Sequence, residues 1–349
     1  MASAAVAVRV KPLLSVSSFH FSQLPTKKIP ILPSATVKMS ASIATESSSS
    51  PSKIIDSHLH VWATPREAAD KFPYFPGNEP TLQGDVDFLL KSIQSAAHLT
   101  NSMEEAGVDG ALIVQPINHK FDHSLVTSVL KKYPSKFVGC LLANPAEDGS
   151  GIKQLEDLIL KDGYRAVRFN PYIWPSGQKM TNEVGKAMFS KAGELGVPVG
   201  FMCLKGINVH FSEIEELCSE FPLTPVIIDH VGFCKPPENN DENEAFSDLL
   251  KLSKFPQVYV KFSALFRVTR KPHPYEDTSY LLSHVLSSYG SKRVMWGSDF
   301  PYVVPECGYK GGKEAVSHVA NLVRLPSADL EWIMGKTVMQ LFPNSWNAA

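Results

Sequence analysis

Two histidines near position 60 have the spacing of side chains that act on one target. His58 and His60 follow a short apolar run at 53–55, which predicts the start of a β-strand. Side chains alternate between the two faces of a strand, so both imidazoles point the same way, with Asp56 behind them. Rings about 6 to 7 Å apart can converge on one metal ion or on one bound substrate. On this stretch alone, two ordinary histidines without a special role remain an alternative.

Two later apolar runs end in side chains that could complete such a site. The predicted strand 224–230 ends in Asp229 and His230, and the predicted strand 293–299 ends in Asp299. A carboxylate in that place can ligate a metal or act as a general base toward water. We interpret Asp229 as a structural hydrogen-bond partner. Together with the histidine pair, these strand ends predict one catalytic site made of His58, His60, His230 and Asp299.

An alternation of strands and helices must position these side chains. Short apolar, β-branched runs predict eight strands, at 53–61, 108–115, 136–143, 164–170, 197–203, 224–230, 257–263 and 293–299. Helical spacing predicts helices at 85–106, 122–133, 151–161, 182–195, 211–221, 241–254, 275–289, 313–323 and 327–341. Such alternation implies a parallel sheet.

The number of repeats decides between two parallel-sheet folds. Eight repeats over about 290 residues fit a closed barrel. An open doubly wound sheet would favour a glycine-rich phosphate turn after its first strand, and the sequence has none there. The predicted fold class is therefore α/β, with a single (β/α)₈ TIM barrel at 52–345 and a short tail at 346–349.

Catalytic groups of such barrels lie at the C-terminal ends of the strands and on the loops that follow. Three side chains in such places are expected to bind substrate: Arg168, Asn170 and Arg267. Burying an arginine near a strand end is costly unless it meets an anion, although an internal salt bridge is the alternative. Lys261 and Lys235 are weaker candidates. The long apolar loop at 62–84 is interpreted either as a flap over the barrel mouth or as packing against a neighbouring loop.

Composition and charge exclude several classes of function. The 349-residue chain has a net charge of −1, which gives no electrostatic footprint for nucleic acid. No apolar run reaches the roughly 18 residues that a membrane span needs. The five cysteines lack CxxC spacing, which argues against a disulfide framework or a thiolate zinc site.

The first 51 residues differ from the rest of the chain. They are rich in serine, basic and nearly free of acidic residues, as organelle transit peptides are. We therefore predict a disordered targeting segment at 1–51. The chloroplast is the expected destination and the mitochondrion is the runner-up, and a plain disordered tail is the alternative.

Three motifs, in this order, resemble those of the amidohydrolase superfamily: Asp56-x-His58-x-His60, Asp229-His230-x-Gly232 and Gly297-Ser298-Asp299-Phe300-Pro301. Over residues 53–345 the chain resembles the amidohydrolase-related (amidohydrolase 2) group of TIM-barrel metal-dependent hydrolases. That group includes hydrolases of dicarboxylate lactones, sugar lactonases and non-oxidative decarboxylases. The resemblance implies that His58 and His60 form the ligand pair of the first strand. It places His230 at the histidine of the sixth strand and makes Asp299 the group that takes a proton from the attacking water.

The fifth predicted strand departs from the family pattern. Members that hold a metal tightly usually have a histidine at its end, where this chain has Met202 and Cys203. The fourth strand offers no lysine or glutamate to bridge two metals, which argues against a binuclear site. One divalent ion, zinc first, could still be held by His58, His60 and Asp299. The lactonase-like branch includes members that work without a metal, and the missing histidine favours metal-independent catalysis here.

The expected activity is hydrolysis, in which water attacks a small carboxylated lactone, or a related ester or amide, with Asp299 as general base. His58, His60 and His230 would polarise the carbonyl, directly or through one divalent metal. The expected partner is a small carboxylated molecule rather than nucleic acid or a membrane. Two alternatives remain: a metal-dependent non-oxidative decarboxylase on the same fold, and a barrel that binds without catalysis. A homo-oligomer is also left open.

Overall fold

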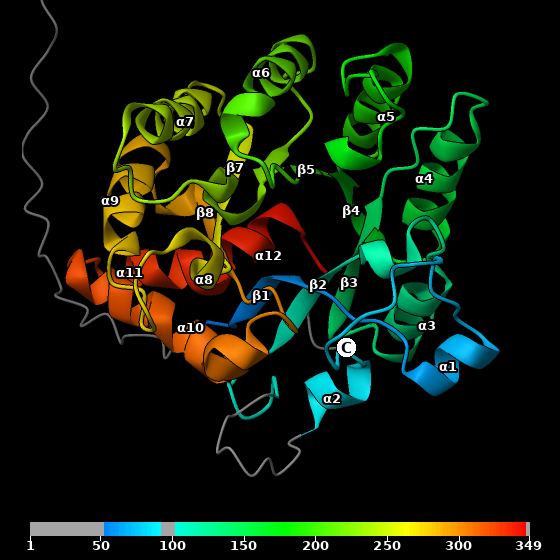
Figure 1. The fold of residues 1–349 in the computed structure, drawn as a ribbon, viewed down its shortest axis with the longest axis horizontal. Helices are drawn as coiled ribbons and strands as arrows, with labels where there is room; N and C mark the ends of the chain where they lie inside the picture. Colours follow the sequence, from blue (N-terminus) through cyan, green and yellow to red (C-terminus); the bar gives the residue numbers. More distant parts are fainter. Residues whose placement is uncertain (1–51, 92–101, 347–349) are drawn as a thin grey trace, which may run out of the picture. The chain divides into compact units, whose positions relative to one another are not determined.

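Eight parallel strands pair in chain order, each with the next, and helices pack around them (Figure 1). This computed structural model describes residues 52–91 and 102–346. The strands are β1 Ile55–Leu59, β2 Gly110–Val114, β3 Phe137–Leu142, β4 Tyr164–Phe169, β5 Val199–Phe201, β6 Val226–Ile228, β7 Val258–Ser263 and β8 Val294–Gly297. Almost every strand residue is buried, as expected for strands covered on both faces. The arrangement confirms the predicted α/β barrel.

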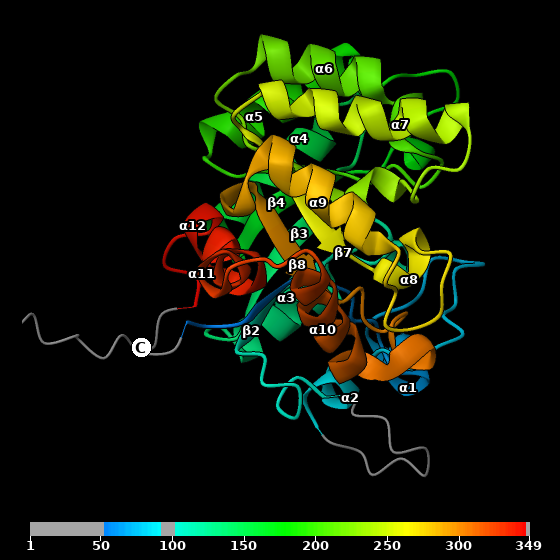
Figure 2. The same cartoon turned by 90° about the vertical axis from the view of Figure 1, so that its left-hand side faces the viewer.

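The helices lie outside the strands. Their bounds are α1 Pro65–Asp70, α2 Val86–Leu90, α3 Ser124–Lys132, α4 Ser150–Lys161, α5 Glu183–Glu194, α6 Phe211–Glu220, α7 Asn240–Lys251, α8 Leu265–Val268, α9 Thr278–Tyr289, α10 Val304–Leu322, α11 Ser327–Glu331 and α12 Thr337–Leu341. The turned view in Figure 2 shows α6, α7 and α9 outside the barrel strands. None of the helices in the described residues is long and apolar enough to cross a membrane.

Three helix predictions differ from the structure, and one of them, at 313–323, begins earlier than expected, as α10 at Val304. The other two do not form single helices. In the predicted helix 85–106, α2 ends at Leu90 and residues 102–107 form turns, while 92–101 lie outside the described residues. The predicted helix 327–341 divides into α11, a π-helical turn at Trp332–Lys336, and α12. Hydrophobic spacing continues through both segments, so the pattern alone does not reveal where the backbone hydrogen bonding changes.

Apolar side chains fill the end of the barrel where the strands begin. Inward-facing residues such as Ile55 and Met295 pack there with Val338, Phe342 and Trp346 from the C-terminal segment. A larger apolar cluster includes residues of both the strands and the surrounding helices. The predicted targeting segment at 1–51 lies outside the described residues, as do residues 347–349 of the predicted tail. The polar site residues are therefore left to the opposite end, where the strands finish.

Candidate active site

The barrel closes between β8 and β1, and this closure brings the first site residues together. The backbone N–H of Asp299 donates to the carbonyl of His58 over 2.8 Å, and that of His60 donates to the carbonyl of Phe300 over 2.7 Å. Gly297 permits this approach, because a Cβ there would lie 2.8 Å from the Cβ and 2.9 Å from the backbone nitrogen of His58. Residues far apart in the sequence thus become direct neighbours at the barrel mouth.

The side chain of Asp56 fastens the same junction. One carboxylate oxygen accepts hydrogen bonds from the backbone N–H groups of His58 and Ser298, each at 2.9 Å, and the other accepts from the hydroxyl of Tyr309 at 2.8 Å. Burial raises the pKa of Asp56 to about 6, even though these hydrogen bonds favour the charged form. Asp56 therefore holds β1 against β8 from a fully buried position.

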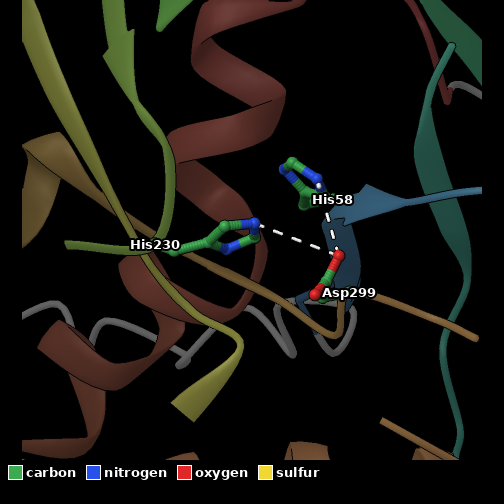
Figure 3. Close-up of side chains that lie close together, drawn as sticks. All are labelled: His58, His230 and Asp299. Atoms are coloured by element: carbon green, nitrogen blue, oxygen red, sulfur yellow. Dashed lines mark ion pairs between the residues drawn. The ribbon is translucent and has the colours of Figure 1, made fainter. Parts of the chain in front are cut away.

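Three imidazoles surround one oxygen of Asp299. Its Oδ1 atom lies 3.4 Å from Nε2 of His60, 3.8 Å from Nε2 of His58 and 3.9 Å from Nε2 of His230. Figure 3 shows Asp299 between His58 and His230. The Nε2 atoms of His58 and His60 are 3.3 Å apart, so the two rings do converge. The structure brings all four predicted catalytic side chains together.

Two of these rings are oriented by a partner on the second nitrogen. Nδ1 of His60 donates to the backbone carbonyl of Val114 at 2.8 Å. Nδ1 of His230 lies 2.8 Å from the hydroxyl of Ser263 on β7. Such contacts fix the plane of an imidazole and determine which nitrogen faces the site. Both rings therefore present Nε2 to Asp299.

A buried ionic network lies beside the third ring. The carboxylate of Asp229 is 3.2 Å from Nδ1 of His58, 3.0 Å from the ammonium of Lys261 and 3.3 Å from Nε of Arg168. Burial alone would raise the pKa of Asp229, but Lys261, His58 and Arg168 hold it well below its usual range. Asp229 thus has the structural contacts expected of it. Lys261 contacts this network and does not line the cavity described below, and the exposed Lys235 does not line it either.

The surroundings of Asp299 and His230 lower the pKa values of both groups. Burial would raise the pKa of Asp299, but His230, His60, Arg267 and His58 outweigh this effect and hold the pKa well below its usual range. Burial lowers the pKa of His230 to about 4, although the nearby carboxylates act in the opposite direction. At neutral pH an ionised Asp299 therefore stands beside a neutral His230, a combination that suits proton transfer.

The turns that carry His230 and Asp299 have left-handed backbone conformations. Their φ angles are 49° and 61°, respectively. For residues other than glycine this conformation costs about 1–3 kcal/mol and is frequent at functional sites. The two predicted strands consequently end earlier than expected, β6 at Ile228 and β8 at Gly297. The chain therefore leaves the sheet just before His230 and Asp299, and both side chains lie at the barrel mouth.

A cavity of about 240 Å³ opens above the cluster. Six of the predicted site residues line it: His60, Arg168, Asn170, His230, Arg267 and Asp299. Apolar side chains such as Met202 and Phe233 complete the wall. His58 is fully buried and does not line the cavity. A bound ligand would therefore contact His60 and His230, whereas His58 lies below these two rings and would not contact the ligand.

The sequence left two roles open for a buried arginine, binding of an anionic substrate and an internal salt bridge. Arg168 and Arg267 each line the cavity and also form an internal ion pair. Nε of Arg267 donates to Oδ2 of Asp299 over 2.6 Å, and its guanidinium lies 4.7 Å from the ring centroid of Tyr302. Arg168 faces the cavity and also pairs with the buried Asp229. The aspartate, glutamate, lysine and arginine residues that line the cavity are these two cations and one carboxylate, Asp299. This excess of positive charge favours an anionic ligand.

Sequence reasoning missed two residues of the cavity wall, Tyr302 and Asn118. The ring of Tyr302 lies 6.0 Å from that of His60, and Asn118 lies in a short 3₁₀ turn after β2. Both residues lie just beyond a strand end, where barrel enzymes carry their site residues. That rule could have found Tyr302, because it comes three residues after Asp299.

The loop at 62–84 does not cover the cavity. The backbone N–H of Phe75 donates to the carbonyl of Asn118 over 2.7 Å, and Trp62 packs edge-on against Tyr302. No residue of the loop lines the cavity. The flap interpretation is therefore wrong, and packing against a neighbouring loop is confirmed.

The cluster has the dimensions of a mononuclear metal site. Ligand atoms around a tetrahedral zinc ion lie about 3.3–3.5 Å apart, and the contacts of the four side chains span 3.3 to 3.9 Å. His58, His230 and Asp299 present ligand atoms that all lie within 4.8 Å of one another. Cys203 is fully buried and burial raises the pKa of its thiol, which does not suit a thiolate ligand. One divalent ion fits these three donors, so His230 replaces His60 in the predicted ligand set.

Residues 55–343 match the protein family described as amidohydrolase. A curated relative, the 4-sulfomuconolactone hydrolase of Rhizobium radiobacter, is 26% identical over 253 residues, which cover 71% of this chain and 75% of that protein.

Solved structures also resemble most of this chain. A probable 2-pyrone-4,6-dicarboxylic acid hydrolase of Acinetobacter baumannii, with citric acid bound, has a TM-score of 0.64 at 17% identity, covering 83% of this chain and 99% of that chain. A 2,6-dihydroxybenzoate decarboxylase in complex with 2,6-dihydroxybenzoate has a TM-score of 0.58 at 15% identity, with the same coverage. At these identities the two structures establish the fold alone.

Proposed function

This chain belongs to the amidohydrolase family and is a hydrolase, and we propose that it opens a small carboxylated lactone, or a related ester or amide, by attack of water. The observation that carries the proposal is the cavity wall, in which an ionised Asp299 and a neutral His230 lie beside two arginines. A relative named for a lactone supports an anionic lactone as the substrate.

In this proposal the arginines bind the substrate and Asp299 removes the proton of the attacking water. Arg168 and Arg267 hold the substrate carboxylate, and His230 and His60 polarise the carbonyl from the cavity wall. Nε of Arg267 lies 2.6 Å from Oδ2 of Asp299. When a substrate carboxylate shares this guanidinium, the stabilisation of ionised Asp299 decreases and its basicity rises. Substrate binding thereby activates the base.

A divalent ion would be held by His58, His230 and Asp299, and when bound it would polarise the carbonyl and acidify the attacking water. The roles of Arg168 and Arg267 in binding and of Asp299 in accepting the proton are the same with or without it. His58 does not line the cavity, so without an ion it acts by orienting His60 and Asp299.

Replacing Asp299 with asparagine tests the proposal. The substitution keeps the shape and removes the proton acceptor, and losing one charged group of such a site costs about 10² to 10³ in kcat. The measurement is proton release from a panel of carboxylated lactones, with circular dichroism to check folding. Asp157→Asn is the matched control, because this exposed aspartate on α4 pairs with Lys161. Equal turnover by wild type and Asp299→Asn would exclude the assigned role.

Metal-dependent decarboxylation is the second candidate, favoured by the metal-sized spacing of the cluster. It requires bound metal and release of carbon dioxide from an aromatic or enol acid. Stoichiometric metal together with such release, and no lactone turnover, would select it. Family membership and an intact cluster do not favour a barrel that binds without catalysis.

Targeting and assembly stay predictions. We propose that residues 1–51 direct the protein to the chloroplast, which imaging of the full chain fused to a fluorescent protein would test against the mitochondrion. Light scattering of the purified protein would determine whether it forms a homo-oligomer.

A further inference from the structure

Arg267 is held at one nitrogen and offers its other two to the cavity. Its Nε donates to Oδ2 of Asp299 over 2.6 Å, and within the described residues its two terminal nitrogens make no hydrogen bond or ion pair. The side chain is 29% exposed and lines the cavity. The terminal N–H groups of Arg267 are therefore the donors that can hold a substrate carboxylate in a two-pronged contact.

One hydrogen bond through Nε does not fix the plane of the guanidinium, because the group can still rotate about that contact. Two aromatic rings restrict this rotation. The guanidinium carbon lies 4.7 Å from the ring centroid of Tyr302 and 5.0 Å from that of Phe266, within the range of about 6 Å in which an aromatic face attracts a cation. Phe266 precedes Arg267 on α8, so Tyr302 is the ring that ties the guanidinium to a different part of the barrel mouth.

The ring of Tyr302, and not its hydroxyl, makes the contacts that hold it. Within the residues that the structure describes, the hydroxyl has no hydrogen-bond partner. The ring centroid lies 5.8 Å from that of Trp62 and 6.0 Å from that of His60, and both contacts are edge-on. A phenylalanine at this position would keep these contacts and the attraction for Arg267.

Trp62 connects this ring to the loop at 62–84. The backbone N–H of Trp62 donates to the carbonyl of Gly84 over 3.0 Å. A Cβ on Gly84 would lie 2.5 Å from Cε2 of Trp62 and 2.8 Å from Cγ of Pro301, the residue before Tyr302. The loop therefore packs directly behind Tyr302, although none of its residues lines the cavity.

We propose that Tyr302 is a positioning residue whose ring orients the guanidinium of Arg267 for a substrate carboxylate, and that the packing of Gly84 against Trp62 holds this ring in place. The role rests on the proposed function, since it presumes a carboxylated substrate. It deepens that function by assigning recognition of the negative charge to a stack of side chains that begins outside the cavity.

The test compares two small ring compounds, 2-furoate and its uncharged amide, 2-furamide, in NMR titrations of the full-length protein. The ratio of their dissociation constants measures recognition of the carboxylate and requires no turnover. Tyr302→Leu should lower the preference for furoate about 5- to 30-fold, as expected for loss of a partly desolvated cation–π contact. Tyr302→Phe retains the ring and should restore the preference to within about twofold of wild type. Tyr280→Leu removes a partly exposed ring of α9 away from the cavity and is the control.

Gly84→Ala tests the outer part of the stack without changing any residue of the cavity. Carbon atoms prefer separations of about 3.5 Å, so the indole of Trp62 must move by about 1 Å. The preference for furoate should fall at least about threefold, because the support of Tyr302 is displaced. Gly77→Ala is the control on the same loop. It strains the backbone, at a φ of 77°, but its Cβ would have no atom within 4 Å, so it should keep the preference.

The combination with Arg267→Met shows whether the effect passes through this arginine. Adding Tyr302→Leu to Arg267→Met should remove no further preference for furoate. An equal loss of furoate and furamide affinity in Tyr302→Leu would mean that the ring contacts the ligand itself, and it would overturn the proposal. An unchanged preference in folded Tyr302→Leu, or no preference in wild type, would overturn it as well.

The binding test is separate from the test of the proposed function. If wild type hydrolyses none of the lactones, the proposed function fails, and the furoate titrations still decide the role of Tyr302. If Tyr302→Leu does not fold, Gly84→Ala decides, because it keeps every side chain of the cavity wall. A full preference for furoate in Gly84→Ala would then refute the proposal.

Discussion

Gly297 is the position where a single methyl group should damage both stability and activity. It lies at the end of β8, where the barrel closes onto β1. An added Cβ would meet the Cβ of His58 at 2.8 Å and the backbone nitrogen of His58 at 2.9 Å. Carbon atoms prefer separations of about 3.5 Å or more, so the two strands must separate by about 0.7 Å in Gly297→Ala.

The expected loss of stability follows from the hydrogen bonds that join β8 to β1. The hydrogen bonds from Asp299 to His58 and from His60 to Phe300, at 2.8 and 2.7 Å, would lengthen toward about 3.5 Å, beyond the normal range. Overpacking of this kind costs about 1–3 kcal/mol of the free energy of unfolding. The same displacement moves Asp299 relative to the histidines, and a misplacement of about 1 Å can lower kcat by about 100-fold.

Gly200→Ala provides a matched comparison on β5. A Cβ at this buried position would find its nearest atoms at 3.7 and 3.8 Å, which are ordinary contacts. Its stability should stay within about 1 kcal/mol of wild type. Urea unfolding and lactone turnover should both separate the two variants. The argument fails if Gly297→Ala behaves as wild type, or if Gly200→Ala loses as much stability and activity.

Acid should destabilise the protein through its buried histidines, because burial lowers the pKa of His123 and His230 to about 4 and the unfolded chain takes up protons first as the pH falls below 6.5. Their contribution is complete above pH 6.5 and is lost toward pH 4, by at most about 3 kcal/mol each. When the free energy of unfolding is measured with urea at several pH values, it should fall less steeply with decreasing pH in His123→Phe than in wild type. An equally steep fall in both proteins would contradict this. Arg168→Met should raise KM for a carboxylated lactone about 10- to 100-fold, since a hydrogen bond to a charged group contributes about 1.5–3 kcal/mol. An uncharged lactone is the control, and equal effects on both substrates would exclude carboxylate binding by Arg168.

The site could be predicted to the extent that it follows from strand order and alternation. Parallel strands in a barrel finish at the same end, so polar residues after separate apolar runs converge there. Arg168 and Asn170 follow this rule from β4, since both line the cavity. The same alternation on β7 pairs Lys261 with Ser263, and these residues contact His58 and His230. The sequence therefore carried a signal for Lys261 facing inward, but not for its contact with a histidine.

The remaining features depend on backbone geometry that no residue type announces. His230 and Asp299 adopt positive φ angles without being glycine, so their runs look like continuing strands. On β1 the register with β2 shifts between Asp56 and Leu59. That irregularity breaks simple alternation, and Ile55 and His58 both face the interior despite their odd spacing. Tertiary contacts at the β8–β1 junction impose these conformations, and a pattern read along one segment does not contain them.

The buried charges beside the histidines are best explained by the site and not by stability. Asp229, Lys261 and Arg168 are each at least nine-tenths buried, and taking such ions out of water costs several kcal/mol apiece. Well-packed apolar residues in the same volume would often be as stable or more so. A barrel that needed only a core would gain nothing from this network. Its contacts orient His58 and place Arg168 in the cavity wall. The network therefore serves to position the site, despite the free-energy cost of burying its charges.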